Sequence, residues 1–256
     1  MTHQTDRRKF FRRLAGATGT LLLTGCDKLS DSEWFGHVLS TGESLNKGAH
    51  HLLRTRKAMA QEFSEADLSP DFRSNGTSFP ESAEYQTMAK ADFKDWSLEI
   101  AGLVATPLKL TMAQIQALPS RTQITRHDCV EGWSAIAKWK GTPLHEIFAL
   151  VNPLPNARYV VFYCADPMED DGTDLYYESI DMEDAYHKQT ILAYELNGTT
   201  LPIKNGAPIR LRVERQLGYK QAKYIMKIAL VAQFDDIAGG KGGYWEDNGC
   251  EWYAGI

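Results

Sequence analysis

The sequence is poor in cysteine and lacks the motifs that attach common redox centres. Four cysteines occur in 256 residues, at positions 26, 129, 164 and 250. There is no C-x-x-C-H segment for haem attachment, and no closely spaced set of thiolates for an iron–sulfur cluster. Any redox chemistry of the chain must therefore exchange electrons with another protein.

The sequence also lacks a basic excess and internal repeats. The formal net charge is -5, and residues 1–25 hold five Lys or Arg against one Asp, so the remainder carries a net charge of -9. Nucleic acids attract proteins through basic surfaces, so we expect no nucleic-acid partner, whereas a basic partner or small solutes suit this balance. No repeat or change in composition divides the chain. We expect a single domain of the α+β class, with mixed sheets and peripheral helices.

No long apolar run is present either, but the N-terminus is typical of an exported protein. Arg7 and Arg8 precede a short apolar run that ends at Leu23, which resembles a twin-arginine (Tat) signal and is too short for a membrane span. Residues 23–26 resemble a lipoprotein processing site, in which Cys26 becomes acylated. The alternative is a plain signal peptide with an incidental cysteine. We expect a periplasmic protein that the Tat translocase carries folded, anchored to the inner membrane through Cys26.

The chain divides into three parts by pattern. Residues 1–26 form the signal and lipid-anchor segment, and residues 27–71 a tether that includes an amphipathic helix at 43–63, where apolar residues keep helical spacing. Residues 72–256 form the folded domain. Within it, Thr111 and Thr142 are typical helix caps, and Asn197-Gly198 predicts a tight hairpin.

The most informative stretch is residues 125–134, which place Cys129 among charged groups. A strand over residues 123–129 would put His127 and Cys129 on one face, and Arg126 and Asp128 on the other. We expect Arg126 and His127 to lower the pKa of the thiol, because the thiolate is the form that binds soft metals or attacks carbonyls. The alternative is that Cys129 is a small buried hydrophobe.

Further motifs follow at residues 192–198, 206–210, 217–223 and 239–247. Together with residues 125–134 they resemble the sulfite oxidase-type molybdopterin-dependent oxidoreductases, especially the exported bacterial members related to the methionine-sulfoxide reductase catalytic subunit. The resemblance covers about residues 72–256, so it implies that this part is a molybdopterin oxidoreductase catalytic domain.

The resemblance implies a molybdenum–molybdopterin cofactor and a set of residues that bind it. Cys129 would coordinate molybdenum, because a soft thiolate steadies a metal that changes oxidation state. The remaining cofactor-binding residues would be Asn75, Cys164, Asn205, Arg210, Gln221, Ala222 and Lys223, in which the arginine and the lysine suit a phosphate group. Arg126, His127, Asp128 and Asp166 are candidates for orienting the substrate because they lie near the presumed metal in the sequence, and we expect the first three to form the catalytic set with Cys129.

The resemblance also implies a reaction and partners. The reaction would be two-electron oxygen-atom transfer on a small sulfite-like or sulfoxide-like substrate, with electrons exchanged with a membrane-bound or soluble cytochrome. The chain departs from the sulfoxide-reductase branch at Cys164, where that branch carries a threonine near the cofactor, and at Ser78-Phe79, where it carries a tyrosine-glutamate pair. Cys250 stands where relatives often carry an aromatic residue, and we expect it to be structural. With no room for a dimerisation domain after Ile256, we expect a monomer or the catalytic subunit of a complex.

Three alternatives use the same residues. A cysteine hydrolase would use His127 as the base for Cys129, but no oxyanion-hole motif accompanies them. A zinc site on His127 and Cys129 lacks further ligands at suitable spacing. A non-catalytic, membrane-tethered lipoprotein would use the same fold as a binding module.

Overall fold

The computed structural model describes residues 34, 41–42, 45, 48, 58–169, 172 and 174–256. Its contacts divide the chain into two units, Met1–Leu53 and Arg54–Ile256. The twin-arginine segment, Cys26 and most of the predicted amphipathic helix lie outside the described residues. Within the described part of the chain, no helix is long and apolar enough to cross a membrane.

The amphipathic helix predicted to reach residue 63 does not extend that far, because residues 58–63 are not helical. The side chain of Gln189 binds the main chain of Ala60 twice, accepting from its nitrogen at 2.7 Å and donating to its oxygen at 3.1 Å. Glu62 forms an antiparallel bridge with Thr125. These distant partners satisfy the peptide groups that a helix would pair locally.

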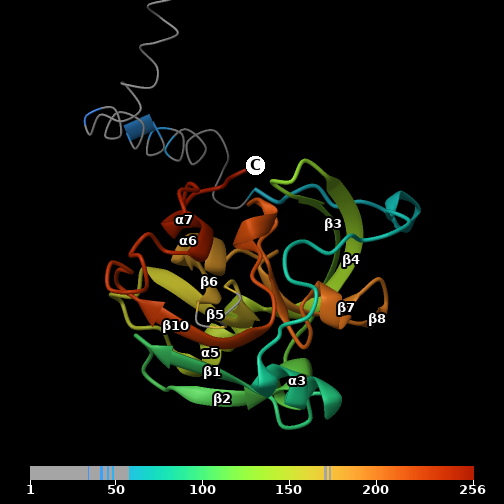
Figure 1. The fold of residues 1–256 in the computed structure, drawn as a ribbon, viewed down its shortest axis with the longest axis horizontal. Helices are drawn as coiled ribbons and strands as arrows, with labels where there is room; N and C mark the ends of the chain where they lie inside the picture. Colours follow the sequence, from blue (N-terminus) through green and yellow to red (C-terminus); the bar gives the residue numbers. More distant parts are fainter. Residues whose placement is uncertain are drawn as a thin grey trace, which may run out of the picture. The chain divides into compact units, whose positions relative to one another are not determined.

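Two five-stranded sheets form the second unit (Figure 1). The first has the order β2-β1-β10-β5-β6, with β1 and β10 parallel and the other pairs antiparallel. Its strands are β1 (Ser97–Gly102), β2 (Leu108–Thr111), β5 (Tyr159–Pro167), β6 (Leu175–Asp181) and β10 (Ile225–Val231). The second has the order β3-β4-β7-β8 with β9 paired to β7, from β3 (Arg121–Asp128), β4 (Ser134–Pro143), β7 (Ile191–Leu196), β8 (Thr199–Thr200) and β9 (Arg210–Arg212).

Short helices connect these strands, so the expected α+β class with peripheral helices is confirmed. They are α3 (Ala83–Lys90), α4 (Met112–Ala117), α5 (Leu144–Val151), α6 (Met182–Ala185) and α7 (Tyr244–Asp247), with 3-10 turns η1 (Glu65–Asp67), η2 (Ile203–Asn205) and η3 (Gly218–Lys220). Thr111 caps α4 as predicted, because its hydroxyl accepts from the nitrogen of Gln114. The cap predicted at Thr142 is wrong: Thr142 belongs to β4, and its hydroxyl donates to the oxygen of Ile115 at 2.8 Å.

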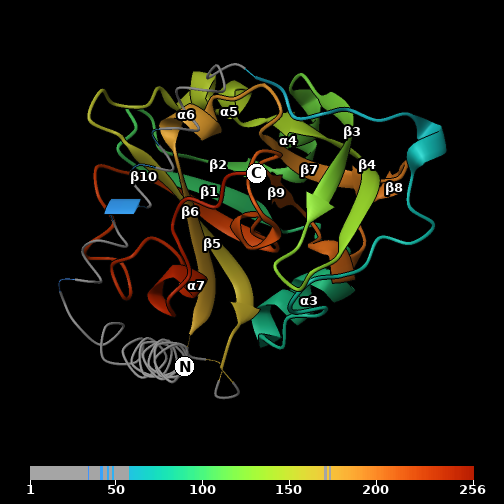
Figure 2. The ribbon, with the colours of Figure 1, turned by 90° about the horizontal axis from the view of Figure 1, so that it is seen from above.

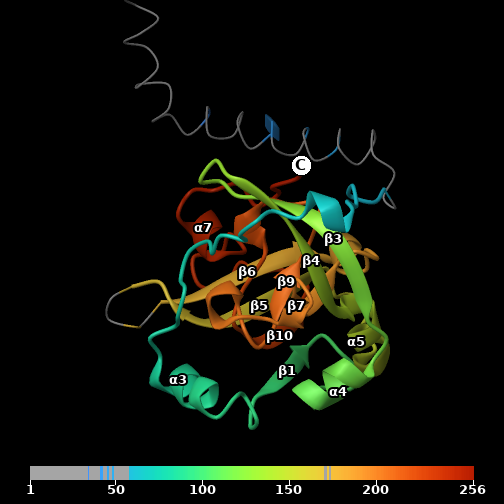
Figure 3. The ribbon, with the colours of Figure 1, turned by 90° about the vertical axis from the view of Figure 1, so that its right-hand side faces the viewer.

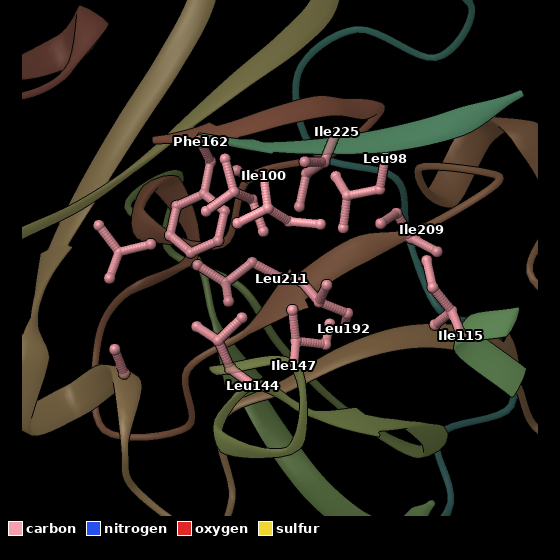
Figure 4. Close-up of a cluster of buried hydrophobic side chains, with 14 of the residues drawn as sticks. Leu98, Ile100, Ile115, Leu144, Ile147, Phe162, Leu192, Ile209, Leu211 and Ile225 are labelled. Carbon is pink, nitrogen blue, oxygen red and sulfur yellow. The ribbon is translucent and has the colours of Figure 1, made fainter. Parts of the chain in front are cut away.

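The main hydrophobic core lies between the two sheets. Figure 4 shows side chains from both sheets and from α5 in one cluster. Its labelled members include Leu98 and Ile100 of β1, Phe162 of β5, Leu192 of β7, Leu211 of β9, and Leu144 and Ile147 of α5, each at most 1% exposed. Burying one such side chain contributes about 1.5–3 kcal/mol, so this cluster fixes how the sheets pack.

Residues 235–256, which we call the C-terminal lobe, are anchored on β6. The hydroxyl of Tyr177 donates to Asp247, and the hydroxyl of Ser179 donates to the oxygen of Gly242. Lys220 lies between Glu178 of β6 and Glu246 of α7 and bonds to both carboxylates, all three side chains being buried. Figures 2 and 3 show α7 beside β6. These bonds hold the C-terminal lobe against β6.

Candidate functional site

A cavity of about 310 Å³ opens where four regions of the second unit meet. These are the loop at residues 75–77, the turn after β3, the β5–β6 hairpin with the segment at 218–223, and the C-terminal lobe. Its lining consists of Asn75, Gly76, Thr77, Cys129, Val130, Glu131, Asp166, Met168, Tyr176, Gly218, Tyr219, Gln221, Lys223, Trp245 and Cys250. The structure thus brings Cys129 together with three of the predicted cofactor-binding residues, Asn75, Gln221 and Lys223.

Cys129 lies one residue beyond the end of β3, in the turn that leads to β4. Its nitrogen donates to the oxygen of Trp133 at 2.9 Å, and its oxygen accepts from Gly132, whose φ of +83° favours glycine. The side chain is partly buried, and the thiol is free. The turn therefore holds the thiol at the cavity wall, beyond the ladder of the sheet.

The pKa of Cys129 is raised, whereas the sequence predicted a lowered pKa. Burial and the nearby Glu131 raise the pKa of Cys129, whereas we expected Arg126 and His127 to lower it. Arg126 instead points away and pairs with Asp128, Nε to Oδ2 at 2.9 Å. A bound cation would remove the proton from such a thiol by its own charge.

Arg126 and Asp128 lie on the face of β3 away from the cavity, as the strand alternation predicts. The side chain of Asp128 also accepts a hydrogen bond from the hydroxyl of Ser134. Neither residue lines the cavity. The expectation that both belong to the catalytic set with Cys129 thus has no support in their placement.

His127 is fully buried beneath the cavity. Its Nδ1 lies 2.9 Å from Nη1 of Arg212, and its ring packs against Phe72 and Trp133. Gly218 leaves the room for this ring, because a Cβ at that position would lie 2.6 Å from Nε2 of His127. His127 is therefore a packed, hydrogen-bonded part of the wall behind Cys129.

Arg210 and Asn205 form a second polar group below the cavity, and both are at most 1% exposed. The guanidinium of Arg210 donates to the oxygen of Asn205 at 3.0 Å and to the oxygen of Gln221 at 3.3 Å. Burial and the adjacent Arg212 lower the pKa of Arg210 to about 9. Hydrogen bonds from Arg210 therefore link it to Asn205 and Gln221, two other predicted cofactor-binding residues.

Lys223 connects this group to the loop at Asn75. Its ammonium donates to the oxygen of Asn75 at 2.5 Å and also to the oxygen of Thr77. Burial, with Arg210 nearby, lowers the pKa of Lys223 to about 7. Burial raises the pKa of Asp166, which also lines the cavity, to about 7. These two opposite charges share one poorly solvated wall.

Cys164 and Ala222 are buried in the core, whereas Cys250 lies at the cavity. Cys164 and Ala222 belong to the main hydrophobic core and do not line the cavity. Cys250, which we expected to be structural, is exposed and lines the cavity from the C-terminal lobe. No local sequence pattern indicates this placement of Cys250, because it depends on how the C-terminal lobe folds back over β6.

Unpaired buried polar atoms gather around the cavity and test whether a polar cofactor fits there. In the described part of the chain, they include Oδ1 of Asn75, both side-chain polar atoms of Asn205, Nε of Arg210 and Oε1 of Gln221. Each such group costs about 1–3 kcal/mol when it is left without a partner. These are the donors and acceptors that a phosphate-bearing pterin needs, so the residues present fit this cofactor.

Two alternatives fail on this geometry. In the described residues, no three His, Cys, Asp or Glu side chains converge to hold a metal ion, which argues against a zinc site made by side chains alone. Nδ1 of His127 is taken by Arg212, and burial with that positive charge lowers the pKa of His127 well below its usual range. His127 is thus a poor general base for Cys129.

The apolar part of the cavity wall was not predicted from the sequence. Met168 and Tyr176 come from the β5–β6 hairpin, and Tyr219 and Trp245 from the segments that follow. Tyr219 and Trp245 lie within two of the motifs quoted above, so motif order was the available signal for them. Met168 and Tyr176 have no local signal, because only the sheet pairing brings them to the cavity.

Comparisons with known proteins identify the family of the chain. Residues 85–236 match the family model described as the oxidoreductase molybdopterin binding domain. A protein of Azospira oryzae, named as a protein-methionine-sulfoxide reductase subunit (YedZ1), is 36% identical over 251 residues, which cover 97% of this chain and 87% of that protein.

A solved structure shows a similar fold. The sulfane dehydrogenase SoxCD of Paracoccus pantotrophus matches with a TM-score of 0.50 and 22% identity, over 55% of this chain and 39% of that one. The family match extends over more than half of the sequence and agrees with the motifs around Cys129. The chain therefore belongs to the oxidoreductase molybdopterin-binding domain family, as an oxidoreductase of the sulfite oxidase type whose cofactor is molybdenum–molybdopterin.

Proposed function

We propose that the protein reduces a neutral organic sulfoxide, moving one oxygen atom and two electrons at the cavity beside Cys129. The observation that carries this proposal is the composition of the cavity, which joins the thiols of Cys129 and Cys250 and a set of unpaired polar groups to an apolar wall. The polar groups suit the cofactor, and the apolar wall suits a substrate without net charge.

The residues would divide the work of holding the cofactor. Cys129 would bind the metal, while Arg210, Lys223 and the amides of Asn75, Asn205 and Gln221 would pair with the pterin and its phosphate. Bound there, the cofactor supplies the two-electron redox chemistry and a site for oxygen transfer. Cys164 and Ala222 would support this set from the core, since neither side chain reaches the cavity.

The charge of the cavity wall favours a neutral sulfoxide over the sulfite anion as substrate. Sulfite is an anion and would need positive partners in a poorly solvated site. Among the described residues, Lys223 is the one Lys or Arg that lines the cavity, and its ammonium already donates to the oxygens of Asn75 and Thr77. Met168, Tyr176 and Trp245 would instead contact the apolar arms of a sulfoxide. The 36% identical relative is named as a methionine-sulfoxide reductase subunit, which supports the same substrate class.

The electrons would come from an external donor, which we propose to be a membrane-bound or soluble cytochrome. Motifs for a second redox centre are absent from the sequence, and the net charge of -9 beyond residue 25 suits a basic donor protein. We further propose that the Tat translocase exports the protein to the periplasm and that acylation of Cys26 anchors it to the inner membrane. The catalytic unit would act as a monomer or as one subunit of a complex.

Substrate profiling with a reduced, neutral electron dye tests the proposal. We expect purified, cofactor-loaded protein to oxidise the dye when methyl phenyl sulfoxide or methionine sulfoxide is added, and to show little turnover of sulfite with an oxidised dye. Rapid sulfite oxidation without sulfoxide reduction would reject the proposed substrate class. Retention of both activities after Cys129→Ser would reject the proposed site.

A further inference from the structure

Asp166 is a buried carboxyl group with one oxygen that no group in the described part of the chain satisfies. It lies in β5, is 4% exposed, and lines the cavity. Its Oδ1 has no hydrogen-bond partner within the described residues. A carboxyl group in this position costs free energy, so its presence at the cavity wall points to an interaction with something bound in the cavity.

We propose that Asp166 donates one of the two protons that the substrate oxygen takes up during sulfoxide reduction. The inference rests on the proposed function. In the overall reaction the sulfur–oxygen bond breaks, the sulfur is reduced by the two electrons that the reduced cofactor holds, and the oxygen leaves as water after gaining two protons. Asp166 supplies one proton, solvent supplies the other, and the Asp166 carboxylate then regains its proton from solvent.

The other groups of the cavity wall are poorer proton donors. Burial raises the pKa of Tyr176 and of Tyr219 above their usual range, so both hold their protons tightly. The ammonium of Lys223 is committed to the oxygens of Asn75 and Thr77. Glu131 is exposed to solvent, whereas Asp166 is buried in the cavity wall.

The surroundings of Asp166 keep its proton exchangeable. Burial raises the pKa of its carboxyl group to about 7, against the opposing effect of Lys223. The other ionisable groups that interact with it are Cys164 of β5, Tyr176 of β6, Tyr85 of α3 and Tyr224 before β10. A general acid is most effective when its pKa lies near the working pH, so this carboxyl group suits the task.

Two substitutions separate proton donation from packing. Asp166→Asn keeps the size and a hydrogen-bonding group but has no acidic proton, and Asp166→Glu restores the acid. Asp174→Asn is the matched control, because Asp174 is an exposed carboxyl group on the same β5–β6 hairpin and does not line the cavity. Molybdenum per chain, dye-linked kcat across pH, and the infrared band of a protonated carboxyl group are measured for each.

We expect Asp166→Asn to keep its molybdenum and to lose about 10²-fold in sulfoxide kcat, which is the usual size of a general-acid contribution. Asp166→Glu should recover part of that loss, and the wild-type decline in kcat as pH rises through about 7 should vanish in Asp166→Asn. The infrared band that wild type loses over the same pH range should be missing from Asp166→Asn, and the control should behave as wild type in every measurement.

Three results would overturn the inference. They are an unchanged kcat and pH profile in Asp166→Asn, a loss of molybdenum in that variant, or a carboxyl band that is absent from wild type. A failure of the proposed function looks different, because wild-type protein loaded with molybdenum would then show no sulfoxide turnover at all.

Discussion

Nη1 of Arg212 lies 2.9 Å from Nδ1 of His127, and both side chains are fully buried. A guanidinium only donates, so Nδ1 must accept this hydrogen bond and the ring proton must lie on Nε2. On its other side, the guanidinium donates from Nε to Oε1 of Glu214 at 3.0 Å. Cζ of Arg212 lies 4.5 Å from the centre of the Trp139 ring. The wall behind Cys129 is therefore built around one defined histidine tautomer.

This relationship predicts that His127 stays neutral, with its proton on Nε2, throughout the range in which a free histidine titrates. Burial and the charges of Arg212 and Arg210 lower the pKa of the ring well below its usual range. Nitrogen NMR of protein labelled at histidine measures the tautomer directly, and His127→Asn assigns the signal among the seven histidines. A ring that is protonated on Nδ1, or that gains a second proton near neutral pH, would disprove this arrangement.

A second prediction concerns the buried ion group that anchors the C-terminal lobe. Lys220→Met should destabilise the protein by about 3–5 kcal/mol, because it leaves the buried carboxylates of Glu178 and Glu246 without their cation. Denaturant unfolding of the cofactor-free protein measures the change. The exposed Lys94→Met is the control and should shift stability by no more than about 0.5 kcal/mol. Equal effects of the two substitutions would show that the group does not hold the lobe.

A third prediction follows from Asp166 and Lys223. Burial raises the pKa of Asp166 from 3.8 to about 7, so the folded state holds its proton longer and stability falls as pH rises over that range. Burial lowers the pKa of Lys223 from 10.5 to about 7, so the folded state releases its proton earlier and stability rises again above about 7.

The contribution of this pair to the free energy of unfolding should therefore be smallest near pH 7 in cofactor-free protein. The limiting slope on either side is about 1.4 kcal/mol per pH unit for one proton. Unfolding of wild type and of the double variant Asp166→Asn/Lys223→Met across pH gives the difference curve. A flat difference curve would show that the two groups titrate as they do in the unfolded chain.

A fourth prediction concerns the apolar wall of the cavity. Trp245 is 41% exposed and lines the cavity, and it is not one of the residues proposed to bind the cofactor. Trp245→Ala should raise KM for an aryl sulfoxide about 10-fold, because it removes apolar contact worth about 1.5 kcal/mol, and should leave kcat and molybdenum content nearly unchanged. A loss of kcat at constant KM would assign Trp245 a different role.

Local signals in the sequence predicted much of the fold. The Asn197-Gly198 hairpin forms between β7 and β8, with φ values of +51° and +80° that these two residues tolerate. Thr111 caps α4, and the alternation along β3 correctly separates His127 from Arg126 and Asp128. These features depend on neighbours a few residues away, which is why the sequence alone could indicate them.

Features that depend on distant contacts were not predictable in this way. Burial raises the pKa of Cys129, and that burial comes from segments distant in the sequence that line the cavity around the turn after β3. Cys250 reaches the cavity only because the C-terminal lobe folds back on β6. Residues 58–63 are not helical, although their side chains keep helical spacing, and the distant Gln189 binds the main chain of Ala60.

The most direct measurement of the central claim is the metal, pterin and sulfur environment of folded protein and of Cys129→Ser. We predict one molybdenum with one molybdopterin per wild-type chain, and one sulfur neighbour fewer around molybdenum in the variant by X-ray absorption. The variant should also lose sulfoxide turnover while its circular dichroism and thermal transition stay those of wild type. Wild-type protein that matures with molybdate yet holds no pterin, or a sulfur shell that is unchanged in the variant, would contradict the account.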